Sequence, residues 1–456
     1  MRPNIILIVL DCVRFDGLHA FGNPRTVTPA LDALAEQSRR YTQARSAAIW
    51  TLPSHASMFT GLHPRQHGVN VETRWLDESI PTMAEMLAQA GYQTVAFSTN
   101  AWVGPHFGLE RGFEDFYALW RIFPNMGKAR FPWWEKALRK GLLERSDKGA
   151  RKLNKYVRKW WKERRDPERP FFLFGLYLDA HLPYRPPKGY AERLLDAAAL
   201  RRARAVNQDA WAYMADEVRM TPEDFAGLRA LYDAEIAYVD DMLADMLRFL
   251  GSVGALENTM IVVTADHGEN IGEHNLMDHQ YCVCETLAHV PLIIHYPDAL
   301  PPGDDNTPVQ HTDLLPTFLD LAEASALTTL PGQSLLSATS LPKPQVIQYT
   351  APHRHRFARR HPDFDPASKG YDRTYDAIVI EGYKLIRSNR KDLWLYDLKD
   401  DPGETINLID KLPERTRQLQ SALDAWMDVT IPMTETASPP ELDEDLQKHL
   451  RGLGYL

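Results

Sequence analysis

The chain has 456 residues, of which 44% are hydrophobic and 25% are charged, and its formal net charge is −9. This length predicts a large domain with a smaller one beside it, and the negative charge argues against a general nucleic-acid-binding protein. No apolar run approaches the length of a membrane span, and three cysteines cannot form a disulfide framework or a four-thiolate zinc site. We therefore expect a cytoplasmic protein without nucleic-acid partners, and no feature of the sequence indicates its oligomeric state.

The first 340 residues alternate between segments typical of buried strands and segments typical of amphipathic helices. The predicted strands are apolar runs at 4–10, 92–98, 171–178, 260–265 and 288–296. The predicted helices lie at 28–40, 79–90, 192–249 and 313–322. This alternation predicts an α/β domain over residues 1–340, with a doubly wound, mostly parallel sheet covered by helices on both faces.

The character of the chain changes after residue 340. Short strand patterns at 345–349, 376–381 and 383–387 are separated by polar turns, and a closing helix is predicted at 414–429. We expect a smaller α+β domain with an antiparallel sheet over residues 341–456.

A basic, tryptophan-rich segment interrupts the first domain at about 121–170. Between 121 and 169 it has 17 Lys and Arg against six Asp and Glu, with four tryptophans interleaved. We expect a helical insertion with solvated basic faces and tryptophans packed on the domain. The alternative is a lid or a patch that contacts an anionic polymer or a membrane surface.

The composition of residues 49–61 suits a reactive hydroxyl at the start of a short helix. Pro53 is tolerated only in a first helical turn, and Gly61 is a good stop signal. The hydroxyl of Thr51 would face unpaired backbone N–H groups and the positive end of the helix dipole, which favour an anion such as phosphate or sulfate. The alternative is a threonine that only caps an ordinary helix.

Acidic and imidazole side chains follow three of the predicted strands. Asp11 follows the first, Asp179 and His181 follow the third, and Asp266 and His267 follow the fourth. Ligands of open α/β sheets bind at the carboxyl ends of the strands. With His274 and His279 close behind, these residues predict a metal or phosphate site.

In this order and spacing, the motifs resemble the sulfatase branch of the alkaline phosphatase superfamily over nearly the whole chain. The shared motifs are Pro3-Asn4-Ile5 through Asp11, Thr51-x-Pro53-Ser54 with Thr60-Gly61, Asp179-x-His181-x-Pro183-Tyr184, Asp266-His267-Gly268-Glu269 with Gly272-Glu273-His274, Val290-Pro291-Leu292, His311-Thr312-Asp313, and Leu395-Tyr396-Asp397-Leu398 with Asp401-Pro402-x-Glu404. The resemblance implies an alkaline-phosphatase-like fold.

The resemblance also implies one divalent metal ion at the carboxyl edge of the sheet. Carried over position by position, Asp11, Asp266 and His267 would bind the metal, and Thr51 would be both a ligand and the nucleophile. A metal-bound threonine hydroxyl is more readily deprotonated, which makes this role chemically sensible. One imidazole and several oxygen donors suit Mn, Zn or Ca.

The chain departs from ordinary sulfatases at three positions. Those enzymes have Cys or Ser at the position of Thr51, which is converted to formylglycine, and threonine cannot form that aldehyde. The second Asp of the family is Cys12 here, which we expect to be a small buried packing residue instead of a ligand. The usual Arg is His55. Threonine in the nucleophile position is similar to nucleotide phosphodiesterases and to phosphoethanolamine or phosphoglycerol transferases of the superfamily.

These departures favour a phosphodiester or a phosphonate monoester as substrate. A threonine enzyme must release its covalent intermediate by attack of water at phosphorus or sulfur. Without the Asp and the Arg, the site has a modest positive field that suits singly charged esters. The alternatives are sulfate ester hydrolysis, transfer to an alcohol acceptor, and a degenerate binding protein. The substrate would be a small-molecule, glycan-linked or lipid-linked ester.

Histidines supply the candidates for proton transfer and substrate contact. His181 and His279 are the candidate acid and base, because an imidazole can protonate a leaving alkoxide and then activate water. His55, His274 and Asn100 are candidate substrate-binding residues. Three other histidines are expected to be structural, namely His67, His289 and His311.

Overall fold

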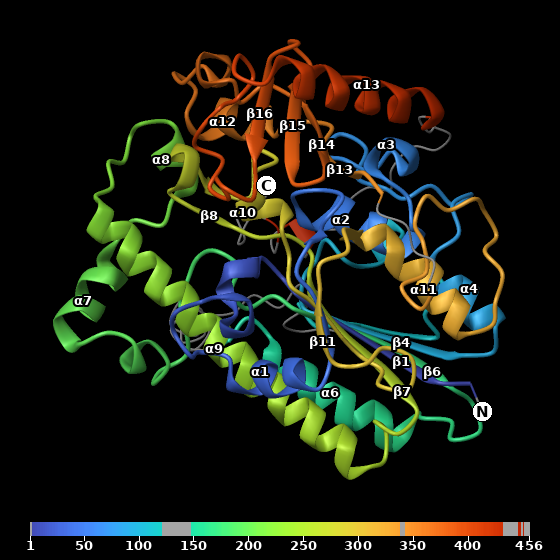
Figure 1. Cartoon of the computed structure of the whole chain (residues 1–456). Coiled ribbons are helices and arrows are strands. Elements are labelled where there is room, and N and C mark those ends of the chain that lie inside the picture. The colour runs from blue at the N-terminus through green and yellow to red at the C-terminus, as the bar shows by residue number, and fades with distance from the viewer. Residues whose placement is uncertain (1, 121–146, 338–342, 432–445, 448–449, 451–456) are drawn as a thin grey trace.

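A computed structural model of the chain describes residues 2–120, 147–337, 343–431, 446–447 and 450. A large sheet with helices on both faces forms the body of the protein, and a separate small sheet is built from the C-terminal part (Figure 1). The predicted domain boundary at 340/341 lies outside the described residues.

The large sheet has eight strands in the order β11-β2-β10-β7-β1-β6-β4-β5. Its strands are β1 (Asn4–Leu10), β2 (Arg39–Tyr41), β4 (Gln93–Ser98), β5 (Asp115–Ala118), β6 (Phe171–Tyr177), β7 (Thr259–Ala265), β10 (Leu292–His295) and β11 (Gly303–Asp305). The central strand β1 pairs in parallel with β6 and β7, and β10 runs antiparallel to both of its neighbours. The mostly parallel sheet expected from the sequence is confirmed.

Helices cover both faces of this sheet. One face carries α1 (Pro29–Glu36), α6 (Ala150–Glu163) and α9 (Pro222–Ser252), and the other carries α2 (Thr51–Thr60), α4 (Met83–Gln89) and α11 (Leu314–Leu321), as Figure 1 shows. Because both faces are covered, the side chains of β1 from Ile5 to Leu10 are fully buried.

Short elements connect the layers. They are α3 (Pro64–His67), α7 (Ala197–Ala205), α8 (Ala210–Met214), α10 (Glu285–Ala288), the two-stranded ladders β3 (Ala44–Arg45) with β12 (Val309–Gln310) and β8 (Asn270–Ile271) with β9 (Met277–Asp278), and the 3-10 turns Phe15–Gly17, His19–Phe21, Pro105–Phe107, Ala191–Arg193, Glu273–Asn275, His311–Asp313 and Pro366–Lys369.

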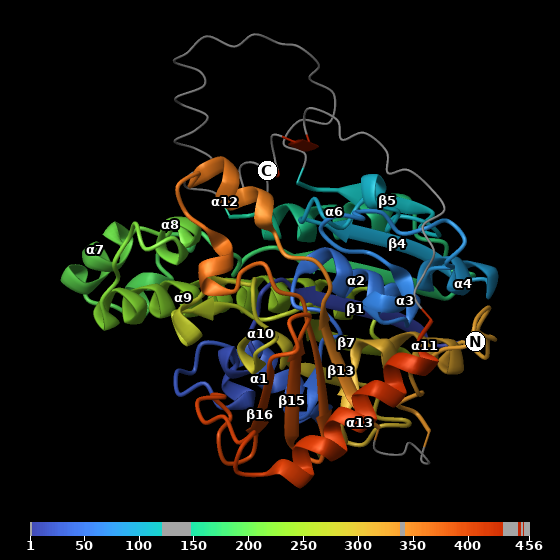
Figure 2. The same cartoon turned by 90° about the horizontal axis from the view of Figure 1, so that it is seen from above.

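The C-terminal part forms an antiparallel sheet, as expected. Its strands follow one another in the order β13 (Gln345–Tyr349), β14 (Tyr375–Ile380), β15 (Tyr383–Ser388) and β16 (Leu393–Asp397). Helix α13 (Pro413–Val429) lies along this sheet, and α12 (Arg354–Arg360) lies in the connection after β13 (Figure 2). Leu419 and Leu423 of α13 pack on Ile378 and Leu385 in a small core of their own.

The structure differs from the prediction in two predicted helical segments and in one strand that was not predicted. The helix predicted at 28–40 ends at Glu36, because Arg39 and Arg40 instead join the sheet as β2 beside the carboxylates of β11. The helical region predicted at 192–249 is divided into separate helices, since Pro222 and the Thr221 capping box begin α9 afresh. Strand β16 carries the Leu395-Tyr396-Asp397 motif and was not predicted as a strand.

The basic insertion is described only in its second half, and residues 121–146 lie outside the described residues. Helix α6 is present, and Trp160 is fully buried, with its indole N–H donating to Asp115. Arg158 and Arg164 form ion pairs with Asp245 and Asp115. Contact with a membrane surface stays a prediction. Among the described residues, no helix combines the length and the apolar character needed to cross a bilayer.

Candidate active site

The segment containing Thr51 forms a buried helix, as its composition predicts. Thr51 is the first residue of α2 and is fully buried, and the residue that caps the helix is Trp50. The simple capping role for Thr51 is therefore wrong. The helix ends at Gly61, whose φ of 68° suits glycine.

His267 is the side chain that faces the Thr51 hydroxyl. The His267 Nδ1 atom lies 2.8 Å from the carbonyl oxygen of Gly268, so this nitrogen carries the proton that it donates. Its Nε2 atom then presents a lone pair, which lies 3.3 Å from Thr51 Oγ1 and 3.4 Å from Asp266 Oδ2. Three of the predicted metal ligands therefore meet at one point.

Asp11 completes the predicted ligand set from the neighbouring strand. Its carboxylate follows β1, and its Oδ2 atom accepts a hydrogen bond of 2.5 Å from Asn100. Ligand atoms of Asp11, Cys12 and His267 lie within 4.8 Å of one another. Asn100 thus orients a predicted ligand in this structure.

The charges in this group fit a divalent cation. Burial raises the pKa of both Asp11 and Asp266 to about 7, and for Asp11 the nearby charge of Asp266 adds to this effect. The buried Oδ2 atom of Asp266 accepts no hydrogen bond from the residues that the structure describes. A buried carboxylate oxygen without a donor is costly, so two carboxylates and an imidazole nitrogen suit a cation as their shared partner.

His279 lies beside this group within a cage of acidic side chains. Its Nδ1 atom lies 2.8 Å from Asp278 Oδ1 and 3.2 Å from Glu269 Oε1. Although burial alone would lower it, these two carboxylates hold the pKa of His279 well above its ordinary value. The His279 ring lies 4.4 Å from the ring of His267 and 5.2 Å from that of His181, centroid to centroid.

His55 and His181 flank the site as neutral imidazoles. His55 donates from Nδ1 to the carbonyl oxygen of Thr51 at 2.9 Å, and His181 donates from Nδ1 to the carbonyl oxygen of Leu182 at 2.5 Å. Burial lowers the pKa of both to about 3. His274 lies apart, exposed in another cluster with Cys284 and Glu404.

Cys12, Asp278 and Glu269 belong to the site although the sequence did not single them out as site residues. Cys12 is fully buried, as expected, but its thiol donates to Asp11 Oδ1 at 3.0 Å and lies 3.7 Å from His279 Nδ1. Cys12 therefore contacts polar groups of the site and is more than a packing residue. For Glu269, its place in the Asp266-His267-Gly268-Glu269 motif was an available signal.

The three histidines expected to be structural have structural contacts. His67 Nε2 lies 3.0 Å from Ser57 Oγ, His289 Nε2 lies 3.0 Å from the carbonyl oxygen of Thr42, and His311 Nε2 lies 3.3 Å from Thr264 Oγ1.

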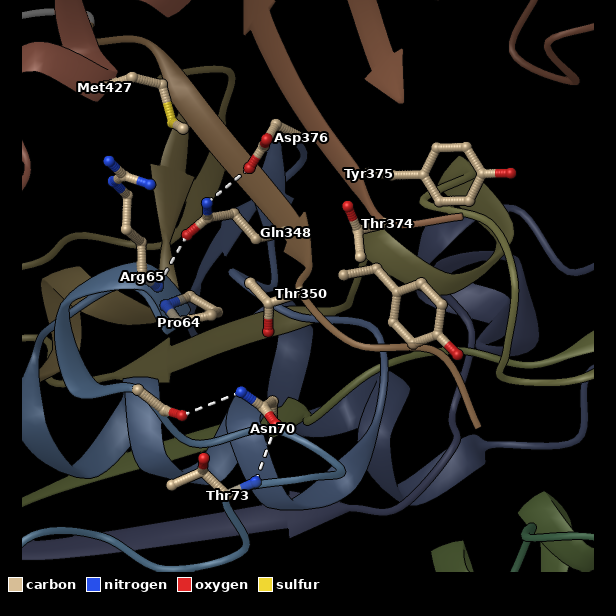
Figure 3. Close-up of a pocket in the computed structure, with 12 residues that line it drawn as sticks. Pro64, Arg65, Asn70, Thr73, Gln348, Thr350, Thr374, Tyr375, Asp376 and Met427 are labelled. Atoms are coloured by element: carbon tan, nitrogen blue, oxygen red, sulfur yellow. Dashed lines mark hydrogen bonds between the residues drawn. The ribbon is translucent and has the colours of Figure 1, made fainter. Parts of the chain in front are cut away.

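A pocket of about 350 Å³ lies between the turn after α3 and the C-terminal sheet. Figure 3 shows Arg65, Gln348 and Asp376 along one wall, with Asn70 across from them. None of the candidate catalytic or metal-binding residues lines this pocket.

Comparisons with known proteins identify the family of the chain. The family model described as Sulfatase matches residues 3–324, and a model described as N-sulphoglucosamine sulphohydrolase, C-terminal, matches residues 272–430. The uncharacterized sulfatase YidJ of Escherichia coli strain K12 is 24% identical over 94% of this chain and 87% of its own length. The arylsulfatase of Clostridium perfringens strain 13 is 26% identical over 93% of this chain and 94% of its own length.

A solved structure also shares the fold. The phosphonate monoester hydrolase of Agrobacterium radiobacter superposes with a TM-score of 0.73 and 22% identity, over 94% of this chain and 96% of that one. This likeness confirms the expected alkaline-phosphatase-like fold. Because the sulfatase model matches most of the sequence, the chain belongs to the sulfatase family of ester hydrolases.

Proposed function

We propose that this sulfatase-family hydrolase cleaves phosphodiesters or phosphonate monoesters, with Thr51 as its nucleophile. The observation that carries the proposal is the buried Thr51 hydroxyl at the start of α2, 3.3 Å from the unprotonated Nε2 of His267. Threonine cannot be converted to formylglycine, so the enzyme needs a route that releases a covalent ester of Thr51.

Asp11, Thr51, Asp266 and His267 would hold the divalent metal ion that enzymes of this family bind. When bound, such an ion lowers the pKa of the Thr51 hydroxyl and offsets negative charge on the attacked group. Mn, Zn and Ca are compatible with these donors, and the Cys12 thiol beside them favours the more thiophilic ions among the three.

The first step forms a phospho-threonine intermediate that keeps the second ester group of a diester or the carbon substituent of a phosphonate. The Thr51 oxygen, after losing its proton to solvent, attacks phosphorus, the bond from phosphorus to the leaving oxygen breaks, and that oxygen takes a proton from His279, whose raised pKa keeps it protonated. His181, the other candidate, is neutral because burial lowers its pKa to about 3, so its role would be substrate contact and not proton donation. In the second step, water attacks the same phosphorus, the bond to Thr51 breaks, and His279 takes up the proton of the water. The carboxylates of Asp278 and Glu269 hold the His279 ring in place for both transfers.

The side chains around Thr51 favour substrates with one negative charge. Among the described residues, no Arg or Lys hydrogen-bonds or ion-pairs with Thr51, Asp11, Asp266 or His267. At the position where the family has an arginine, this chain has the imidazole of His55. Diesters and phosphonate monoesters carry one charge and match this field better than phosphate monoesters do.

Sulfate monoesters also carry one negative charge, and the names of the E. coli and Clostridium relatives favour them as the second candidate. A sulfatase of this kind would require water to attack sulfur in a Thr51 sulfate ester. The relative rates of hydrolysis of phosphorus esters and sulfate esters therefore decide between the two substrate classes.

The test is an initial-rate screen on matched nitrophenyl esters, which are a phosphate diester, a phenylphosphonate, a phosphate monoester and a sulfate. The metal-stripped protein is resupplied with Mn, Zn or Ca. Thr51→Ala should abolish turnover, whereas Thr60→Ala at the far end of the same helix is the matched control and should keep it. After an acid quench, mass spectrometry should find on Thr51 a phosphoryl group with its remaining ester substituent, or the phosphonyl group when the phosphonate is used.

The outcomes separate the alternatives. Sulfate turnover above diester and phosphonate turnover would replace the proposal with a threonine sulfatase. Turnover that survives in Thr51→Ala would exclude Thr51 as the nucleophile. Release of nitrophenol that occurs only after an alcohol acceptor is added would indicate a transferase, and no turnover with any metal would favour a binding protein. Unchanged turnover of a poor-leaving-group ester in His279→Ala would exclude His279 as the proton donor, and unchanged turnover in His181→Ala would exclude a role of His181 in the reaction.

A further inference from the structure

A second group of metal-ligating side chains lies outside the candidate active site. A nitrogen of His274, the sulfur of Cys284 and an oxygen of Glu404 all lie within 4.8 Å of one another. Cys282 precedes Cys284 by two residues, a spacing that places both side chains on one face of an extended segment. One thiol, one imidazole and one carboxylate therefore converge at one place, and the second thiol, that of Cys282, is two residues away along the chain.

Buried contacts hold these groups in position. The Lys384 Nζ atom is fully buried and donates to the carbonyl oxygen of Val283, between the two cysteines, at 2.5 Å. The same atom lies 2.9 Å from Glu404 Oε1, and the other oxygen of Glu404 accepts from the backbone N–H of Glu285 at 2.6 Å. The thiols and the carboxylate are thus fixed relative to one another, while His274 is exposed and leaves access from solvent.

The charge balance at this place selects the kind of ion. The carboxylates of Glu285 and Glu404 face the cations of Arg45 and Lys384, so the buried charges already cancel. A hard dication would add two uncompensated positive charges there. An ion that displaces both thiol protons brings two thiolate charges with it, so the balance is kept.

We propose that His274, Cys282 and Cys284, with Glu404 at the fourth position, form a second metal site for a thiophilic divalent ion, with zinc as the best match. Binding releases the two thiol protons to solvent and forms two metal–sulfur bonds, one metal–nitrogen bond and one metal–oxygen bond. The site would join the segment that carries His279 to the turn after β16, since α10 lies next to the C-terminal strands (Figure 1).

Cobalt(II) loading of the full-length protein tests this site directly, because thiolate ligands give cobalt a charge-transfer absorption in the near ultraviolet. The remaining cysteine, Cys12, lies in the candidate active site, so the experiment is done in a Cys12→Ser background under a non-chelating reductant. We expect the absorption to appear there and to vanish when Cys282→Ser and Cys284→Ser are added. Metal analysis should find one zinc fewer per chain in that variant.

Two further variants keep the test independent of folding and of the proposed catalysis. His274→Ala changes an exposed residue and should weaken cobalt binding at least about tenfold, because even outer-shell partners contribute 10–100-fold to metal affinity. Asp11→Asn with Asp266→Asn removes the other site and should retain one zinc per chain. An absent absorption in the Cys12→Ser protein, one that survives loss of Cys282 and Cys284, or an unchanged affinity in His274→Ala would overturn the proposal.

Discussion

Lys384→Met should be one of the most destabilising single changes in the C-terminal sheet. The Lys384 ammonium is fully buried and lies 2.9 Å from both Glu285 Oε1 and Glu404 Oε1. Methionine has similar volume, so packing changes little, but Glu285 then keeps only the Arg45 cation and Glu404 loses the cation that it faces. Removing one partner of a buried ion pair typically costs about 3–5 kcal/mol, and we expect a loss in the free energy of unfolding of this size.

Urea denaturation at pH 7 measures this loss, with the exposed Lys399→Met as the matched control, for which we expect a change within about 0.5 kcal/mol. The wild-type ion pairs hold the pKa of Glu285 well below its ordinary value, so their contribution is present above that ordinary value and is lost as the pH falls. The difference between wild type and Lys384→Met should therefore shrink toward pH 4. Adding Glu404→Gln should recover part of the loss. A cost below about 1 kcal/mol at pH 7 would refute the reasoning.

Three further predictions follow from other contacts. Asn100→Ala removes the donor to Asp11 and should lower the affinity for the divalent metal about 10–100-fold in a calorimetric titration, whereas an unchanged affinity would exclude an orienting role. Burial raises the pKa of Asp240 to about 6, so ionisation of this carboxyl opposes folding. As the pH rises from 4 to 7, the free energy of unfolding of Asp240→Asn should therefore increase by about 2–3 kcal/mol relative to that of wild type. Parallel pH profiles of the two proteins would contradict this prediction. Gly268→Ala places a Cβ atom 2.0 Å from the carbonyl oxygen of Thr286. This clash should lower the free energy of unfolding by at least about 1–3 kcal/mol, measured by thermal unfolding, and should remove most of the activity, measured as initial rates. A melting temperature equal to that of wild type would show that the backbone moves to accept the methyl group.

The parts of the fold that could be predicted are those with a strong local signal. The apolar run of β1 is buried on both faces, and its composition is that of a central parallel strand. Strand β2 gave no such signal, because its two arginines are held at the sheet by carboxylates about 265 residues away in sequence. Pairings over such separations depend on tertiary contacts that no local window contains.

The candidate active site also contains some residues whose positions could be predicted from the sequence and others whose positions could not. Asp11, Asp266 and His267 follow buried strands that are adjacent in the sheet, so their convergence could be predicted from parallel pairing. The positions of Cys12 and Asp278 could not, since both have positive φ values and depend on turns that re-aim the side chain. Their residue types alone are more common as packing or surface residues.

The departures from the family pattern at Cys12 and His55 form one local change. The Cys12 backbone N–H donates to Asp266 Oδ1 at 3.2 Å, and His55 Nδ1 lies 3.6 Å from the other oxygen of the same carboxylate. An acidic and a basic side chain of the family are thus replaced on both sides of a single proposed metal ligand. Losing both together keeps the net charge near Asp266 unchanged, whereas losing only one would leave a buried charge without its partner. With both charges absent, the carboxylate of Asp266 keeps its place beside the imidazoles of His55 and His267, and this is the arrangement on which the proposed cleavage of singly charged esters at Thr51 relies.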